Sequence, residues 1–267
     1  MNAQSLALGP ATVRASARNG MFLGFGTFFR KEIADWVRSR RALVIGAVVL
    51  AAATFSTVIP YIVGMTGESS SMPLSLDPTD NVLLGWVGQT MPIVALLASM
   101  SLLSGERDRG TLAWSLTRPV SPTSILAAKW LAAVLVLAVV AIVVPLAVSI
   151  GIATVVYGGL PDLGTIGLFA ALYVTVPAFY VALALALGTV VKGTGGIAGI
   201  GFLVMFLPSV IGALVPIVGK ITPTAIGEWA MAVATGQPAS TLTLVGFLVG
   251  MAILAVGAKV IFDHQEV

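Results

Sequence analysis

The sequence of 267 residues contains no cysteine, one histidine and few charged side chains. Without cysteine there is no disulfide, thiolate metal ligand or thiol nucleophile, and a single histidine, His264, excludes a metal site built on clustered histidines. Charged residues make up 9% of the chain, whereas a soluble domain has about 25%. A soluble enzyme, a nucleic-acid-binding domain and a disordered chain are therefore excluded, because so few charges cannot cover a water-exposed surface.

Most of the sequence is apolar. Hydrophobic residues make up 58% of the chain and the mean hydropathy is +1.03. Several apolar runs exceed the roughly 18 residues that indicate a transmembrane helix. We therefore predict an all-α, polytopic membrane protein with six transmembrane helices within residues 42–262. The predicted spans are Leu43–Val63, Val82–Ser104, Leu131–Tyr157, Thr165–Val191, Ile197–Gly219 and Thr241–Ala258. Irregular turns are expected at Pro92, Pro145, Pro177 and Pro208, since proline removes a helical hydrogen bond.

The lysines and arginines are distributed unequally between the two sides that six spans would define. Thirteen of the 14 fall in the N-terminal segment, in the loop after the second span, or at Lys192 and Lys259. Only Lys220 falls on the other side. The positive-inside rule then predicts that both termini are cytoplasmic.

The segments that flank the spans have patterns of their own. We expect residues 1–20 to be a flexible tail and residues 263–267 a C-terminal tail. Residues 21–41 read as an amphipathic interface helix, with one arc of Phe22, Phe25, Phe29, Ile33 and Trp36 and an opposite arc of cations. The pattern leaves open whether this helix only anchors to lipid or also touches a partner. Residues 220–240 are expected to be an outer re-entrant or interfacial segment, in which Glu228 either faces a substrate exit or is solvated.

The predicted spans contain no Asp, Glu, Lys, Arg or His, which disfavours a proton-driven carrier, because a proton must be held in mid-bilayer. Candidate residues for a substrate pathway are Gln89, Ser99, Tyr173 and Tyr180, each of which can instead be a hydrogen-bonding residue in helix packing. A pathway with so few polar groups suits a lipid-like or amphipathic cargo better than a bare ion.

The densest polar sequence is the predicted cytoplasmic loop 105–129. It begins with four consecutive charges, continues as a short apolar helix around residues 111–116, and breaks at Pro119. Ser121 or Thr123 can cap the next helix. A short helix held between two spans can transmit a push from a soluble partner. The alternatives are a solvated, self-paired charge run and a simple turn at Gly110.

The loop and the N-terminal segment resemble a known family. The matching residues are Glu106-x-x-x-Gly110-Thr111-Leu112, then Arg118-Pro119-Val120-Ser121, Ile125-Leu126 and Lys129, together with Phe29-Arg30-Lys31-Glu32. They are similar to the membrane subunit of ABC-type exporters, six-span permeases whose ATPase is encoded separately. The resemblance implies two permease subunits side by side in the plasma membrane of a prokaryote, with ATPase subunits beneath. It also implies that ATP and Mg bind to the partner ATPase and that this chain has no cofactor and no catalytic residue.

The resemblance assigns roles to particular residues. The loop helix would be the coupling helix, and its residues are Glu106, Arg107, Asp108, Arg109, Gly110, Thr111, Leu112, Trp114, Arg118 and Pro119. The interface helix would brace the same ATPase through Arg30, Lys31, Glu32, Trp36 and Arg38. Trp114 would either anchor the coupling helix in a groove of the ATPase or face the lipid headgroups. The expected partners are the ATPase, a second permease subunit and membrane lipids, with no nucleic acid. The alternatives are an ion-coupled carrier or channel working alone and a membrane-embedded enzyme, the latter disfavoured because no cluster of acids or histidines is present.

Overall fold

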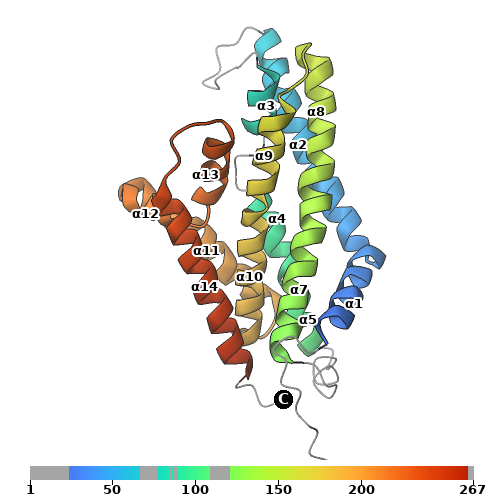
Figure 1. The fold of residues 1–267 in the computed structure, drawn as a ribbon, viewed down its shortest axis with the longest axis vertical. Coiled ribbons are helices and arrows are strands. Elements are labelled where there is room, and N and C mark those ends of the chain that lie inside the picture. Colours follow the sequence, from blue (N-terminus) through green and yellow to red (C-terminus); the bar gives the residue numbers. More distant parts are fainter. Residues whose placement is uncertain (1–23, 67–76, 85, 87–89, 109–120, 264–267) are drawn as a thin grey trace, which may run out of the picture.

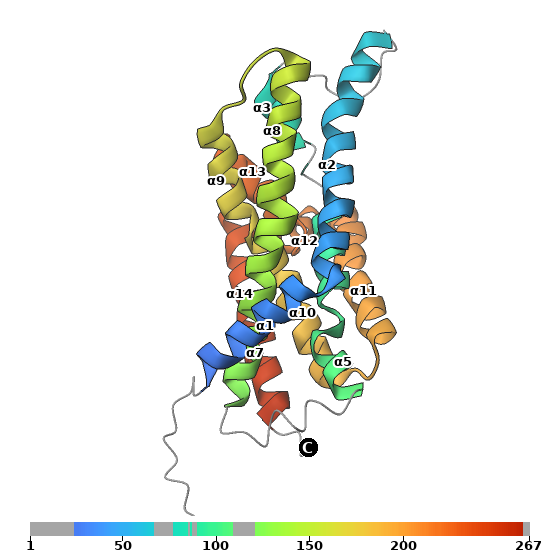
Figure 2. The same ribbon diagram turned by 90° about the vertical axis from the view of Figure 1, so that its right-hand side faces the viewer.

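The computed structural model describes residues 24–66, 77–84, 86, 90–108 and 121–263. Within these residues the only regular structure is helical, which confirms the all-α prediction. The long helices run lengthwise through the molecule, and the first helix, α1 (Phe25–Arg38), crosses them at one end (Figures 1 and 2). We call the end that carries α1 the lower end and the opposite end the upper end. The predicted tails, residues 1–20 and 264–267, lie outside the described residues.

Five helical stretches are long and apolar enough to cross a membrane. They are formed by α2 (Arg40–Thr66), α7 (Pro122–Leu137) with α8 (Val144–Tyr157), α9 (Leu163–Tyr173) with α10 (Thr175–Val190), α11 (Thr194–Leu214) and α14 (Thr241–Asp263). The α7–α8 stretch has 35 residues, or about 52 Å at 1.5 Å per residue, whereas the hydrocarbon core of a bilayer is about 30 Å thick. The α7–α8 stretch therefore extends beyond the membrane core.

The predicted second span, Val82–Ser104, is not one continuous helix. It is divided into α3 (Pro78–Leu84), α4 (Thr90–Ser99) and α5 (Ser101–Asp108), which step from the upper to the lower end (Figure 1). Backbone groups released from a helix inside a bilayer need partners within the protein. One is supplied here, because the Tyr173 hydroxyl donates to the Trp86 carbonyl at 2.7 Å. The structure thus has five long helices and one interrupted crossing where six continuous helices were expected.

Proline explains two irregular positions in the long helices. A π-helical turn at Ala138–Val143 directly precedes the α8 turn that contains Pro145. The helix that contains Pro177 is interrupted between α9 and α10, three residues before the proline. Both follow from the missing N–H and from the clash of the ring with the preceding turn. Pro92 lies in the first turn of α4, where a missing N–H is tolerated, and α11 remains helical through Pro208.

The predicted fifth span ends earlier than expected. Helix α11 ends at Leu214, and the chain then forms α12 (Pro216–Ile221) and α13 (Ala225–Ala234). Helices α11 and α12 come very close, since a Cβ added to Gly212 would lie 2.6 Å from the Gly219 Cα. Glycine at position 212 therefore permits this helical hairpin, whereas a Cβ on Gly219 would lie 3.4 Å from the Gly212 Cα, an ordinary contact. The predicted segment 220–240 contains the end of α12 and all of α13, on the upper side of α11 and α14 (Figure 1).

Candidate functional site

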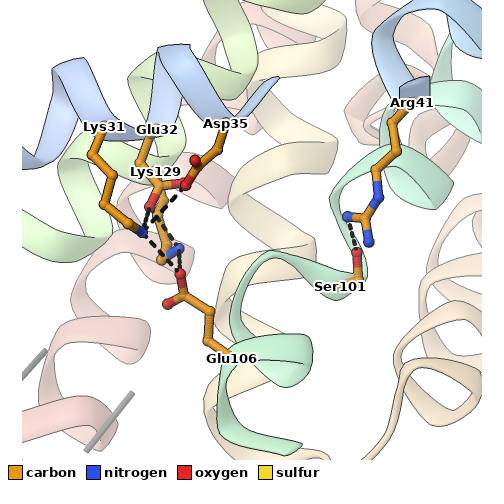
Figure 3. A network of polar contacts seen from close by, with 7 residues as sticks. All are labelled: Lys31, Glu32, Asp35, Arg41, Ser101, Glu106 and Lys129. Carbon is orange, nitrogen blue, oxygen red and sulfur yellow. Dashed lines mark hydrogen bonds and ion pairs between the residues drawn. The ribbon is translucent and has the colours of Figure 1, made fainter. Parts of the chain in front are cut away.

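Five charged side chains from three helices meet at the lower end (Figure 3). Helix α1 contributes Lys31, Glu32 and Asp35, helix α5 contributes Glu106, and helix α7 contributes Lys129. The Lys129 Nζ lies 3.0 Å from the Glu32 Oε1 and 2.9 Å from the Glu106 Oε1. The Lys31 Nζ lies 3.3 Å from Glu32, 3.5 Å from Glu106 and 3.4 Å from Asp35. We refer to these five residues as the charge cluster.

Helix α1 brings its acidic residues to the cluster because its buried face shares Trp36 with the predicted apolar arc but is rotated toward Phe28 and Glu32. Phe28, Glu32 and Trp36 are buried, at a spacing of four residues, and α1 packs along α7. Ile33, which was expected on the apolar arc, is only half-buried. Ser39 then separates α1 from α2 in an extended conformation, and its Oγ donates to the Trp36 carbonyl at 3.0 Å.

Helix α7 holds Lys129 two turns from its start. Ser121 caps this helix, since its Oγ accepts a hydrogen bond from the Ser124 N–H at 3.1 Å. Lys129 shares its face with Ile125, Ala128 and Ala132, and all four are buried. Burying a lone lysine costs several kcal/mol, and only close carboxylates can offset that cost. Glu32 and Glu106 supply them, with side chains that are 5% and 12% exposed.

Lys31 closes the cluster on its exposed side. Partial burial alone would lower the pKa of Lys31, but the carboxylates of Glu32, Glu106 and Asp35 outweigh it, and the pKa lies above its usual value. A raised lysine pKa means that the stabilisation is present below the usual pKa and is lost only as the pH rises through the folded-state value. The cluster therefore keeps Lys31 charged throughout the physiological range.

Helix α5 is fixed on two further sides. The Arg41 Nη1, at the start of α2, donates to the Ser101 Oγ at 2.7 Å (Figure 3). The Arg107 Nη2 donates to the Thr189 carbonyl of α10 at 3.2 Å. A cavity of about 340 Å³ lies between the charge cluster and Arg41, with Trp36 and Ser39 in its wall. The start of α5 is thus tied to α2, and its end is tied to α1, α7 and α10.

The structure places only part of the predicted coupling residues. Glu106, Arg107 and Asp108 form the end of α5, where Glu106 turns into the charge cluster and Arg107 toward α10. The remaining predicted coupling residues, Arg109, Gly110, Thr111, Leu112, Trp114, Arg118 and Pro119, lie outside the described residues. Of the predicted interface-helix residues, Lys31 and Glu32 belong to the cluster, Trp36 is buried, and Arg30 and Arg38 are exposed.

The predicted pathway residues are buried in the helical body. Ser99, Tyr173 and Tyr180 are at most 1% exposed, and Gln89 lies outside the described residues. Tyr173 donates to Trp86 at the interruption of the second span. The Ser99 Oγ and the Tyr180 hydroxyl have no hydrogen-bond partner within the described part of the chain. Of these three side chains, Tyr173 is the one whose polar atom makes a hydrogen bond within the described residues.

Four residues of this region were not singled out as site residues from the sequence, namely Asp35, Arg41, Ser101 and Lys129. A signal for Lys129 was present, because it follows Ile125 by four residues and precedes Ala132 by three, on one helical face. Glu32 likewise stands seven residues after Phe25 and four before Trp36. A charge within an apolar stripe predicts burial and therefore a partner of opposite charge.

The helical body and its long apolar helices together define a multi-pass helical membrane protein. The chain belongs to the ABC-2 transporter family, because the family model described as "ABC-2 family transporter protein" matches residues 27–267. No individually curated protein matches the sequence. The match confirms the resemblance to an ABC-type permease subunit, and members of this family generally work with an ATPase partner.

Proposed function

We propose that this chain is the transmembrane subunit of an ATP-driven exporter. Two such subunits form the substrate pathway as a dimer, and cytoplasmic ATPase subunits drive it through the segment between α5 and α7. The observation that carries the proposal is the charge cluster, in which Lys129 joins both ends of this segment to α1.

The cluster suits the transmission of force. Glu106 lies just before residues 109–120 and Lys129 lies just after them, and the two are in direct contact at 2.9 Å. Glu32 holds the same Lys129 Nζ from α1. Ion pairs with little water around them are stronger than exposed ones and are costly to break. A partner that displaces the segment therefore moves α5, α7 and α1 together, and Arg107 passes the displacement to α10.

The orientation follows from the distribution of cations. Among the described lysines and arginines, Lys220 is the one that lies in α12, near half height in the molecule and above the lower end that contains the charge cluster (Figure 1). The positive-inside rule then assigns the lower end and both termini to the cytoplasm of a prokaryotic cell. This is the side on which an ATPase has access to ATP.

In this proposal the chain has no catalytic residue, and ATP hydrolysis takes place in the partner subunit. ATP and Mg²⁺ bind to the partner ATPase, and the second permease subunit is the same chain or a paralogue. Cargo with an apolar portion suits the predominantly apolar helical body.

The test is co-purification of the full chain with the ATPase encoded beside it, followed by measurement of ATP turnover in liposomes. The wild-type chain should bind the ATPase and change its turnover several-fold. Glu106→Gln should keep the fold, because Lys129 remains paired with Glu32, but it should reduce the change in turnover. Asp162→Asn, at the upper end of α9, is the matched control and should behave as wild type.

Two outcomes would contradict the proposal. One is a lack of association with the ATPase. The other is transport driven by an ion gradient in liposomes that contain this chain alone, which would identify a secondary carrier or channel.

A further inference from the structure

The upper part of the molecule contains a cavity of about 620 Å³. Its walls come from α11, α12, α13 and α14, with Tyr173 and Val176 on a further side. The close hairpin at Gly212 and Gly219 forms one of these walls. Small-molecule sites commonly enclose about 300–1,000 Å³, so the cavity can hold a polar headgroup or a small solute.

Two opposite charges line this cavity without neutralising each other. Lys220 of α12 and Glu228 of α13 are both exposed. Among the described residues, neither makes an ion pair with the other or with any third side chain. A cavity with one separate cation and one separate anion is complementary to a zwitterion.

Three hydroxyl groups in the wall add hydrogen-bond acceptors. Thr222 donates to the Gly219 carbonyl at 2.8 Å, and Ser209 donates to the Met205 carbonyl at 3.1 Å. The Thr224 Oγ1 lies 3.0 Å from the Thr222 Oγ1 and 3.2 Å from the Ser209 Oγ, and in each pair either oxygen can be the donor. Each hydroxyl has one proton and two lone pairs. Thr222 and Ser209 each direct a proton at a backbone carbonyl, while most lone pairs of the three hydroxyls have no donor among the described residues, and the group therefore favours a ligand that donates hydrogen bonds.

The helices beside the cavity present apolar side chains outward. Leu214 at the end of α11 is 82% exposed and Ile217 of α12 is 62% exposed. Trp229 of α13 is half-buried in the cavity wall, and tryptophan prefers the boundary between lipid and water. Acyl chains can lie along these apolar surfaces while a headgroup occupies the cavity.

We propose that this cavity binds a zwitterionic phospholipid with a primary ammonium headgroup. Lys220 binds the phosphate, and Glu228 with the hydroxyls of Thr224 and its neighbours binds the ammonium. The acyl chains lie against α11 and α12. This site is separate from the charge cluster and does not depend on an ATPase.

The test is native mass spectrometry of the full chain in detergent, with three added lipids. These are phosphatidylethanolamine, phosphatidylcholine, which has the same charges but no N–H group, and anionic phosphatidylglycerol. Wild type should retain phosphatidylethanolamine most strongly. Lys220→Gln should weaken all three lipids, and Glu228→Gln should weaken only the two zwitterionic ones. Each loss should be roughly tenfold, as expected for one charge-assisted hydrogen bond.

Two further variants complete the design. Thr224→Val should reduce the preference for phosphatidylethanolamine over phosphatidylcholine, and Lys192→Gln, at the lower end, should leave all three affinities unchanged. Equal retention of the three lipids, or identical behaviour of wild type and Lys220→Gln, would overturn the proposal. Competition by soluble phosphoethanolamine at the concentration of the lipid would also overturn it, because the ligand would then be a free solute.

Discussion

Lysine and glutamate side chains occur together in two regions of this molecule, but they are paired in one region and unpaired in the other. At the lower end Lys129 is 1% exposed and is paired with two carboxylates, whereas Lys220 and Glu228, in α12 and α13, are exposed and line a cavity without pairing with each other. A buried charge must be neutralised by the protein itself, while an unpaired charge remains available to a ligand. Pairing therefore separates charges that hold helices together from charges that can recognise another molecule.

The two regions also differ in backbone construction. The charge cluster joins helices that continue into the body of the molecule, notably α7 with its 35-residue stretch. The upper cavity is enclosed by short elements, including the six-residue helix α12, and by a glycine contact. The lower end is consequently suited to transmit movement, and the cavity to adapt its wall to an occupant.

The largest expected effect is at the lower end. Lys129→Ala removes the buried cation and leaves Glu32 and Glu106 only the half-exposed Lys31, at 3.3 and 3.5 Å, so it should destabilise the fold by about 3 kcal/mol. Thermal unfolding in detergent should show this as a clearly lowered melting temperature. Glu32→Gln leaves Lys129 paired with Glu106 and should therefore lower the melting temperature less than Lys129→Ala does. If Lys129→Ala melted like the exposed control Lys192→Ala, the cluster would not hold the helices together.

An intermediate effect is expected at the wall of the upper cavity. The added methyl group of Gly212→Ala would meet the Gly219 backbone, and such overpacking should cost about 1–3 kcal/mol. Gly199→Ala is the matched control on the same helix, since its Cβ would meet nothing within 4 Å. Gly199→Ala should stabilise the fold by roughly 0.5–1 kcal/mol, because alanine is more stable than glycine inside a helix. A loss of stability in Gly199→Ala as large as that in Gly212→Ala would show that the hairpin contact is not the limiting one.

The smallest effect is expected for the unpaired charges. Lys220→Gln and Glu228→Gln should each change the free energy of unfolding by less than about 0.5 kcal/mol, because no partner is lost. The measurement is the same melting experiment, without added lipid. A marked loss in either variant would mean that these side chains are structural, and the contrast between the two regions would disappear.

Much of the fold was predictable because its signals are local. Apolar run length predicted the membrane class, and the positions of Pro145 and Pro177 predicted irregular turns. The second span was harder to predict, since Val82–Ser104 is predominantly apolar and contains no charged residue but is divided into short helices. Hydropathy measures how well a segment tolerates lipid, and a broken helix buried among its neighbours has the same composition as a continuous one.

The sequence by itself determined the membrane class, the family and the concentration of cations at one end, because composition, run length and motif spacing are properties of the chain alone. Only the tertiary structure decided that Lys129 is neutralised by Glu32, 97 residues away, and that Lys220 and Glu228 remain unpaired in one cavity. The physical reason is that the energy of a charge depends on its surroundings. Those surroundings are supplied by helices that are distant in sequence and become neighbours only when the helices pack.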